Sequence, residues 1–352
     1  MSTQERATTS PEARPAEPPS SMALLHLLNG TFVSQAISVA ARLGVADALA
    51  YGSRSVAELA EMLGAHAPSL YRLLRGLTDT GVVTELAGGK FALTPFGEPL
   101  RSGVPGSLRA AATMVGMPFH RNAWTELYES VRTGESAFAR THGSTLFDYL
   151  AEHPEEAAIF DGAMTASAVA YAEVWEVYDF ARFTRVVDVG GGKGQILGPI
   201  LAANPHLEGV LFDTPDVVAD AGPILSEAGV TERCWVAAGS FFDTVPTEGD
   251  AYLLTNVIHD WDDDSAAQIL SACRRAMTED ATILLVEGML SEQLDGDLSR
   301  LVDLNLMAVT PGGRLRTEEE YAALLERAGL QLTRVLSAGP ASIIEAVPAS
   351  GV

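Results

Sequence analysis

The chain has 352 residues, 47% of them hydrophobic, and a formal net charge of −23 at pH 7. This length favours two domains, and the hydrophobic content suffices for a large core. Because so acidic a surface repels phosphate backbones and anionic lipids, neither nucleic acid nor a membrane is an expected partner.

The N-terminus and the cysteines narrow the class of protein further. Residues 1–20 are rich in Ser, Thr, Pro, Ala and Glu, which predicts a disordered tail without the apolar core of a signal peptide. No stretch approaches the ~20 apolar residues that a membrane helix needs. The two cysteines form no disulfide framework and have no metal-ligand spacing, so we expect a cytoplasmic protein without a metal site.

Residues 21–110 are predicted to form a mainly helical winged-helix domain. Apolar residues spaced three and four apart from 22 to 49 predict a first helix. A capping box at Ser55 and a proline at 68 start two more helices, and two short strands follow around a Gly-Gly turn.

Two features of this domain favour packing or dimerisation over DNA binding. The helix predicted over 69–80 offers only Arg72 and Arg75 to a DNA backbone. The first helix has more apolar surface than so small a domain can cover, which suits a partner subunit.

Residues 111–183 are predicted to be a helical linker that also lines a substrate pocket. Aromatic and methionine side chains in helices usually belong to a core, but helices between two domains can also line a site for a flat ligand. Those in this region, with one histidine, are His120, Trp124, Phe147, Tyr149, Phe160 and Met164.

From residue 184 to 348 strands alternate with helices, which predicts an α/β fold with a parallel, doubly wound, Rossmann-like sheet. Strands are predicted over 186–189, 209–212, 234–237, 251–258, 281–287, 331–336 and 341–346. Helices are predicted over 195–203, 215–228, 264–277 and 317–328.

A glycine-rich turn follows the first of these strands. It contains Asp188 and the glycines Gly190, Gly192 and Gly194. Glycine lets the backbone turn tightly and approach a ligand, and such a turn in a βαβ unit is typical of a nucleotide site. The spacing is G-x-G-x-G, unlike the dinucleotide fingerprint or the P-loop, and with a preceding acid it is the usual S-adenosylmethionine form.

Residues after the next two strands suit a nucleoside. Asp213 stands where a carboxylate can accept hydrogen bonds from two ribose hydroxyls, although a helix N-cap is the alternative because Pro215 follows. Phe241 and Phe242, preceded by Ser240, offer flat faces for an adenine ring or simply pack in the core.

A candidate acid–base pair lies at the carboxyl edge of the predicted sheet, where α/β folds bind their ligands. Asn256, His259, Asp260 and Trp261 lie at and just past the end of one strand, and Glu287 ends the next. A single histidine is most often structural, but at this edge it is a candidate general base with an ordinary pKa of about 6.5. Glu287 is expected to fix its tautomer and stabilise the imidazolium.

These motifs, with the P-G-G-R-L-R-T segment at 311–317, resemble the plant-type small-molecule O-methyltransferases over residues 22–346. Bacterial relatives in that family act on polyketide antibiotics, phenazines and similar aromatic natural products. The resemblance implies a homodimer joined through the winged-helix region, S-adenosylmethionine on the Rossmann-like domain, and a pocket for a small aromatic substrate roofed by the middle helices. It implies methyl transfer to a substrate hydroxyl, with in-line attack after His259 removes the proton.

The family's residue roles transfer unevenly to this chain. Its catalytic base matches His259, its base-orienting acid Glu287 and its ribose acid Asp213. The acid that often contacts adenine falls at Ser240, and a second acid near the catalytic histidine falls at Leu315, so neither is acidic here. Asn256 joins the cofactor set by the same resemblance. The substrate-pocket residues that it implies are His120, Trp124, Phe160, Met164, Asp260, Asn305 and Met307.

Three alternatives remain open at this point. Some bacterial relatives keep the fold and the cofactor but hydroxylate or decarboxylate their substrate, and in others nitrogen or carbon accepts the methyl group. A winged-helix regulator that senses a ligand is the non-enzymatic alternative. His259 and Glu287 favour methyl transfer over hydroxylation or decarboxylation, and the acidic surface disfavours the winged-helix regulator.

Overall fold

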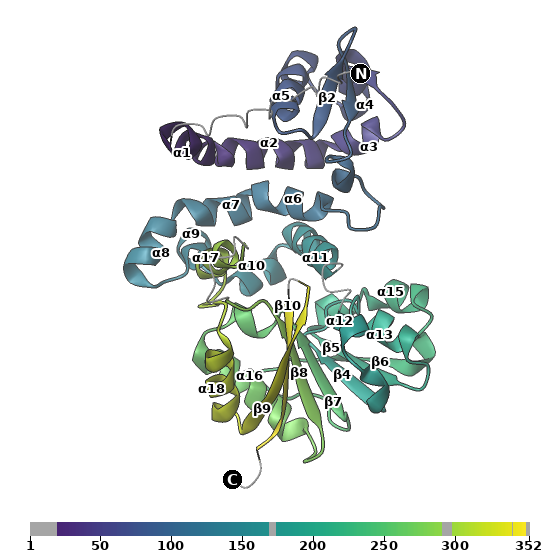
Figure 1. Cartoon of the computed structure of the whole chain (residues 1–352), viewed down its shortest axis with the longest axis vertical. Helices are drawn as coiled ribbons and strands as arrows, with labels where there is room; N and C mark the ends of the chain where they lie inside the picture. The colour runs from purple at the N-terminus through teal and green to yellow at the C-terminus, as the bar shows by residue number, and fades with distance from the viewer. Residues whose placement is uncertain (1–19, 169–173, 291–297, 340, 350–352) are drawn as a thin grey trace, which may run out of the picture.

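The computed structural model describes residues 20–168, 174–290, 298–339 and 341–349, so the tail expected over 1–20 lies almost wholly outside the described residues. Three layers are stacked along the long axis of the molecule (Figure 1): an N-terminal domain, a middle layer of helices, and a sheet domain.

The N-terminal domain has the expected order of helix, turn, helix and hairpin. The side chain and backbone of Ser55 form the predicted capping box with Glu58. The hairpin strands pair antiparallel around the glycine turn, and a short strand before the capping box completes the small sheet. The elements are α1 (Ser20–Leu28), α2 (Gly30–Leu43), α3 (Val45–Leu49), β1 (Arg54–Ser55), α4 (Val56–Leu63), α5 (Ala67–Asp79), β2 (Val83–Leu86) and β3 (Lys90–Leu93).

The helical stretch Ser20–Leu43 corrects one expectation drawn from the sequence. It is 24 residues long, and an 18-residue window within it has a mean hydropathy of 1.3. This is enough by length and composition to cross a membrane, and only 6% of the window is buried. A single such helix near the N-terminus is only a weak indication of a membrane span. Its exposed apolar side chains are Met22, Leu24, Leu25, Leu27, Leu28, Phe32 and Val33.

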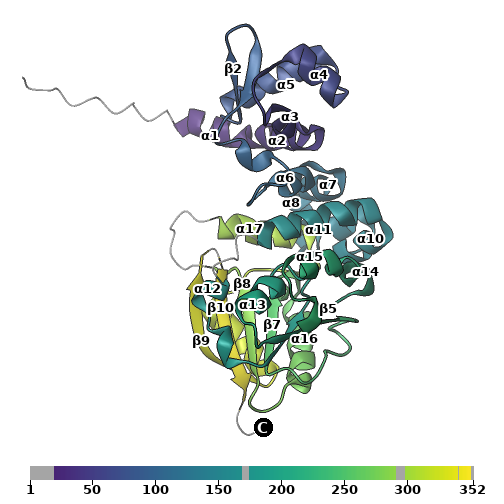
Figure 2. The ribbon, with the colours of Figure 1, turned by 90° about the vertical axis from the view of Figure 1, so that its right-hand side faces the viewer.

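The middle layer is made of short helices packed around a small apolar core. One of its helices, α17 (Ser299–Val309), comes from the far C-terminal part of the chain and packs against α7 and α9. Figure 2 shows it level with α11 of the middle layer. No helix was predicted there from the sequence, although Val302, Leu306 and Val309 stand at helical spacing. The other members are η1 (Glu98–Leu100), α6 (Arg109–Gly116), α7 (Pro118–Thr125), α8 (Leu127–Thr133), α9 (Ala137–His142), α10 (Leu146–Glu152) and α11 (Pro154–Ala168).

The large sheet has seven strands in the order β6-β5-β4-β7-β8-β10-β9. The first five in that order are parallel, whereas β10 pairs antiparallel with both of its neighbours, so the sheet is mixed and not wholly parallel as expected. Adjacent strands joined by a short connection can only pair antiparallel. The strands are β4 (Arg185–Val189), β5 (Glu208–Asp213), β6 (Cys234–Ala238), β7 (Ala251–Thr255), β8 (Thr282–Glu287), β9 (Leu330–Ala338) and β10 (Ala341–Pro348).

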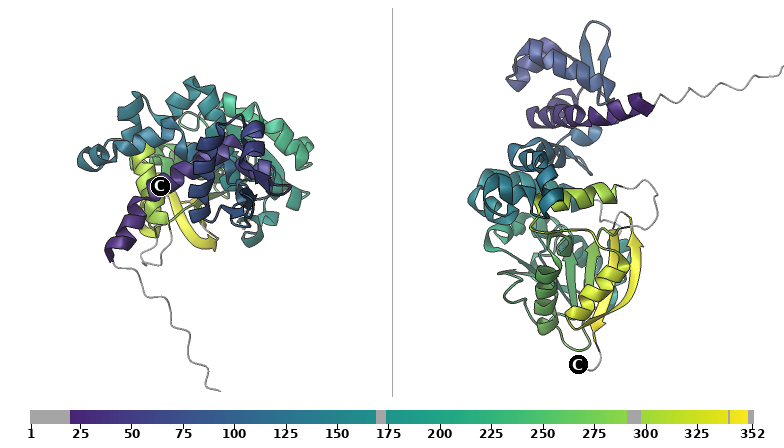
Figure 3. Two further views of the ribbon diagram at one scale, coloured as in Figure 1. Left: turned by 90° about the horizontal axis from the view of Figure 1, so that it is seen from above. Right: turned by 90° about the vertical axis from the view of Figure 1, so that its left-hand side faces the viewer.

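Helices cover both faces of this sheet, as a doubly wound fold requires (Figure 3). Alternate residues of one strand face opposite cores: Ile283 and Leu285 pack with the helices α16 and α18, and Leu284 and Val286 with α13 and α15. The helices and turns are α12 (Val174–Val177), η3 (Phe180–Arg182), α13 (Leu197–Ala203), α14 (Pro215–Val218), α15 (Ala221–Glu227), η4 (Thr231–Arg233), η5 (Ile258–Asp260), α16 (Asp263–Ala276) and α18 (Glu318–Arg327).

Several predicted boundaries were wrong. The single helix expected over 22–49 is divided into α1, α2 and α3, with Gly44 in the left-handed conformation between the last two. The helix expected over 215–228 is two helices, α14 and α15, and the strand expected over 251–258 ends at Thr255. Because the chain leaves the sheet at that point, the turn η5 stands above the carboxyl edge and carries its side chains over it.

Candidate active site

The glycine turn between β4 and α13 has the open backbone that the sequence predicts. Gly190, Gly192 and Gly194 all have positive φ, at 71°, 62° and 91°. A Cβ at the intervening Gly191 would lie 2.5 Å from Asp188 Oδ2, so a side chain there would collide with the acid below the turn. Packing on Asp188 therefore requires glycine at 191, and the positive φ angles of its neighbours hold a turn that other residues rarely adopt.

Two carboxyl groups lie under this turn. Asp213 Oδ2 accepts a hydrogen bond from Gly192 N at 2.9 Å and Oδ1 accepts one from Thr214 N at 2.7 Å, and the N-cap of α14 is Thr214 and not Asp213. Asp188 is fully buried, and neither of its oxygens has a hydrogen-bond partner within the described ranges. Burial, reinforced by the charge of Asp213, raises the pKa of Asp188 to about 8.

The turn is also tied to helix α11 of the middle layer. Lys193 Nζ lies 3.2 Å from Asp161 Oδ2 of α11 and 3.2 Å from Asp220 Oδ2. Gln195 Nε2 donates to Thr165 Oγ1 of the same helix at 2.9 Å. These contacts join the nucleotide side of the site to a helix that carries predicted pocket residues.

An aromatic wall runs from the turn toward the middle layer. Phe241 lies against the glycine turn, since a Cβ at Gly190 would come within 3.6 Å of its ring. Trp261 meets Phe242 edge-on at 4.7 Å between ring centroids and stacks on Phe147 of α10 at 5.3 Å. Ser240 Oγ accepts from Phe242 N at 3.2 Å, which holds the loop that carries the two phenylalanines.

His259 and Glu287 lie together, as the neighbouring strand ends predict. His259 Nδ1 is 2.6 Å from Glu287 Oε2, and Glu287 is fully buried. The other oxygen, Glu287 Oε1, accepts from the backbone N–H groups of Val257 and Ile258 at 3.1 and 2.7 Å. The carboxylate is therefore held rigidly by β7–η5 backbone while it faces the imidazole.

The pKa of this histidine differs from the ordinary value that the sequence suggests. Burial lowers the pKa of His259, but the charges of Glu287 and Asp260 outweigh burial and raise it to about 9. Asp260 Oδ1 lies 3.6 Å from His259 Nε2, and burial raises the pKa of Asp260 itself to about 6. The imidazole is therefore a stronger base than the sequence suggests.

A second polar cluster lies in the middle layer. Asn305 Oδ1 accepts from Trp124 Nε1 at 3.0 Å and lies 3.1 Å from His120 Nε2. Because an indole N–H can only donate, the oxygen of the Asn305 amide must face Trp124. His120 is buried, not on the surface, and burial lowers its pKa, which favours the neutral ring.

The remaining predicted residues are less closely connected. Phe160 meets Phe147 edge-on, whereas Met164 is exposed and Met307 is half-buried. Asn256, just past β7, has a positive φ of 54°. Surface cavities of about 570 and 310 Å³ are lined by none of the predicted site residues.

Two members of the aromatic wall were missed as site residues. Trp261 directly follows His259-Asp260 in the chain, which is a local signal that could have found it. Phe147 was named among the aromatic side chains of the predicted pocket region, but only the tertiary structure places it on Trp261.

A Rossmann-like sheet with a G-x-G-x-G turn, an acid at the end of the second strand and a histidine–carboxylate pair at the same edge defines the class of S-adenosylmethionine-dependent methyltransferases. The chain belongs to the O-methyltransferase family: its residues 124–331 match the O-methyltransferase domain model, and residues 25–101 match the O-methyltransferase dimerisation domain model. The expected fold class, enzyme class and cofactor are thereby confirmed.

Similar proteins act on several aromatic natural products. Phenazine O-methyltransferase PhzM of Lysobacter antibioticus is 42% identical, over 94% of this chain and 97% of its own. The 8-amino-8-demethylriboflavin N,N-dimethyltransferase of Streptomyces davaonensis is 38% identical, over 85% and 87%. The solved neocarzinostatin-biosynthesis O-methyltransferase, in complex with S-adenosylmethionine and 2-hydroxy-5-methyl naphthoic acid, is 34% identical with a TM-score of 0.79, over 90% and 96%.

The buried Asp188 makes stability depend on pH. Its folded pKa of about 8 lies above its ordinary value of 3.8, so its contribution is fully present in acid and is lost as pH rises from about 4 through 8. Asp188→Asn should therefore raise the melting temperature of the cofactor-free protein at pH 8 by a few degrees and change it little at pH 5. Asp280→Asn, at an exposed position, is the control, and an equal effect of both variants at pH 8 would contradict the prediction.

Removing the charge of Glu287 should lower the pKa of His259 from about 9 toward its ordinary value. Glu287→Gln keeps the shape and an oxygen for the backbone N–H groups but takes away the anion beside Nδ1. NMR titration of the His259 ring measures this directly. An unchanged titration midpoint in the folded variant would show that Glu287 does not set the basicity of the ring.

Proposed function

We propose that this enzyme transfers a methyl group from S-adenosylmethionine to a hydroxyl of a small aromatic natural product, with His259 as the base. The observation that carries the proposal is the 2.6 Å contact between His259 and the fully buried Glu287 at the sheet edge that bears the glycine turn. In this arrangement residues 21–110 serve dimerisation, 111–183 roof the acceptor pocket and 184–348 bind the cofactor.

The residues of the nucleotide side fit S-adenosylmethionine. The three glycines hold the turn in a positive-φ conformation, with room beside Gly192, and the Asp188 carboxyl under the turn has no hydrogen-bond partner within the described ranges. Asp213 would hold the ribose, and Phe241 and Phe242, with Ser240, would flank the adenine; Gly190, Gly192, Gly194 and Asn256 complete the set. When bound, the cofactor supplies an electrophilic methyl group on a sulfonium.

His259 removes the proton of the acceptor hydroxyl through Nε2, the ring nitrogen that faces away from Glu287. The proton remains on an imidazolium that Glu287 stabilises, and the deprotonated oxygen is left able to accept the methyl group; with the cofactor bound, S-adenosylhomocysteine would be the leaving group. A base with a pKa of about 9 nearly matches a phenol, whose pKa is about 10, so the transfer is close to balanced. Holding the two reactants in this geometry supplies most of the remaining acceleration.

The acceptor would lie between the aromatic wall and the middle layer. His120, Trp124, Phe160, Met164, Asp260, Asn305 and Met307 are the proposed contacts. A flat ring suits the faces of Trp261 and Phe147, and the polar Asn305 cluster suits a substituent on that ring. Hydroxylated phenazines and naphthoates, named for the relatives above, are the first acceptors to test.

N-methylation is the second candidate reaction. The similarity to an N,N-dimethyltransferase supports it, since the same base and cofactor site can serve an amine acceptor. The atom that carries the methyl group in the product decides between the two.

The proposed assembly is a cytoplasmic homodimer. The exposed apolar side chains of α1 and α2 lie in the region that matches the dimerisation domain model. A second copy of the chain would cover this surface, which explains its hydropathy without a membrane. Nucleic acid is not a proposed partner.

Loss of the base should abolish turnover without loss of the cofactor. His259→Ala is expected to lower kcat by about 10²- to 10⁴-fold, the usual contribution of a positioned general base. S-adenosylmethionine affinity, measured by calorimetry, should stay nearly unchanged. His66→Ala, at an exposed histidine of the N-terminal domain, is the control.

Turnover is read by mass spectrometry of the acceptor after incubation with methyl-labelled S-adenosylmethionine. A product that gains the labelled methyl group on oxygen supports the proposal. A product that gains oxygen or loses carbon dioxide instead would overturn it, as would parallel loss of activity and cofactor affinity in His259→Ala.

A charge on the dimer surface should separate the subunits. Phe32 is 70% exposed in the single chain, so Phe32→Glu should not disturb the fold of the monomer but should place a charge in the proposed interface. Sedimentation should then report a smaller species than for the natural chain. Tyr128→Glu, at a site 75% exposed on α8, should leave the size unchanged.

A further inference from the structure

Arg316 is the largest fully buried side chain of the described residues, yet the proposed reaction gives it no role. It lies between α17 and α18, in the segment that follows the middle-layer excursion of the chain. A buried guanidinium is stable only when its donors are satisfied by well-placed acceptors. The acceptors of its hydrogen bonds therefore indicate which part of the structure Arg316 holds in place.

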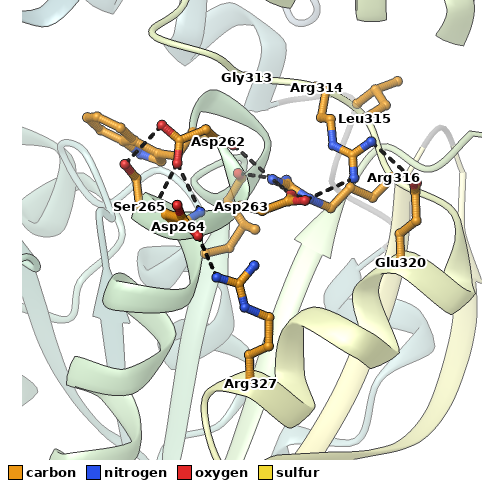
Figure 4. A network of polar contacts seen from close by, with 12 residues as sticks. Asp262, Asp263, Asp264, Ser265, Gly313, Arg314, Leu315, Arg316, Glu320 and Arg327 are labelled. Carbon is orange, nitrogen blue, oxygen red and sulfur yellow. Dashed lines mark hydrogen bonds and ion pairs between the residues drawn. The ribbon is translucent and has the colours of Figure 1, made fainter.

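Those acceptors belong to the turn that carries His259. Arg316 Nη1 donates to Ile258 O at 3.1 Å and Nη2 to Trp261 O at 2.9 Å, so the two bonds bracket His259 and Asp260. Nε and Nη2 also bind Asp263 Oδ1 at 3.0 and 2.8 Å, in the first turn of α16 (Figure 4). The guanidinium fork thus holds both ends of η5 against α16.

The residues just before Arg316 hold the middle of the same turn. Arg314 N donates to His259 O at 2.8 Å. Gly313 packs so closely that a Cβ there would overlap His259 O and Thr310 Oγ1. Gly313 and Arg314 therefore contact the carbonyl oxygen of His259 itself, while the Arg316 side chain binds the carbonyl groups of Ile258 and Trp261 on either side of it.

We propose that Arg316 is a positioning residue for methyl transfer: its guanidinium fixes the η5 backbone so that His259 keeps Nδ1 on Glu287 and presents Nε2 to the acceptor. This rests on the proposed function of His259. Arg316 would thus act on the reaction only through His259, because its fully buried side chain binds the η5 backbone and Asp263.

The charge of Arg316 has a second, separable effect. His259 faces Glu287 and Asp260, both of which raise its pKa, and Arg316, which lowers it; Tyr321 of α18 lies buried near Arg316 and Glu287. Removing the guanidinium charge should therefore raise the pKa of His259, whereas a variant that keeps the charge should not. Position and charge can thus be told apart with two variants.

The experiment compares Arg316→Met, which loses charge and fork, with Arg316→Lys, which keeps the charge but cannot span both carbonyls. Both should lower the limiting kcat by about 10- to 100-fold, the cost of a small misplacement of reacting groups. S-adenosylmethionine affinity should stay within about twofold. Only Arg316→Met should move the NMR titration of His259 to higher pH. Arg327→Met is the matched control, since Arg327 binds Asp264 in the same turn of α16 from the surface.

A folded Arg316→Met protein with natural kcat would overturn the proposal, whatever the titration of His259 shows. Equal loss of kcat and cofactor affinity would show a merely structural role. If neither Arg316 variant folds, Asp263→Asn is used, because Asp263 is partly exposed and its loss only loosens the fork. A several-fold lower kcat with unchanged cofactor affinity is then expected, and natural kcat would again overturn the proposal. The NMR titration needs no turnover, so it measures the effect of the Arg316 charge on His259 even if the natural enzyme transfers no methyl group.

Discussion

The contact on which the rest of the site depends is the one between His259 and Glu287. A fully buried carboxylate is tolerated only when its oxygens are occupied, and here two backbone N–H groups take one oxygen and the imidazole faces the other. The geometry of the turn η5 and the basicity of the ring are therefore linked. A shift of the turn would withdraw the hydrogen bonds of Glu287 and the partner of His259 together.

This constraint explains why so much of the chain converges on one short turn. The turn leaves the sheet after β7, so its carbonyl groups lack strand partners and must find them elsewhere. Residues 313–316 supply them, after α17 has crossed the middle layer. The segment 299–316 thus carries both Asn305, in the proposed pocket wall, and the residues that hold the backbone around His259.

The two halves of the site meet through aromatic and ionic contacts. Trp261 stands between Phe242 on the nucleotide side and Phe147 on the middle layer, so both halves share one wall. On the other side, Lys193 and Gln195 join the glycine turn to α11. The same elements therefore form walls of both the nucleotide side and the middle-layer side. This arrangement suits a reaction between two molecules held next to each other.

The sequence alone determined the features set by local pattern: the strand–helix alternation, the glycine turn after β4, the capping box at Ser55, and the placing of His259 and Glu287 at neighbouring strand ends. Local spacing also sufficed to recognise the family. Tertiary structure alone decided the reversal of β10, the helix α17, the raised pKa of His259, and the contacts of Phe147 and Arg316. These depend on packing between residues far apart in the chain, and on burial, which no local pattern encodes.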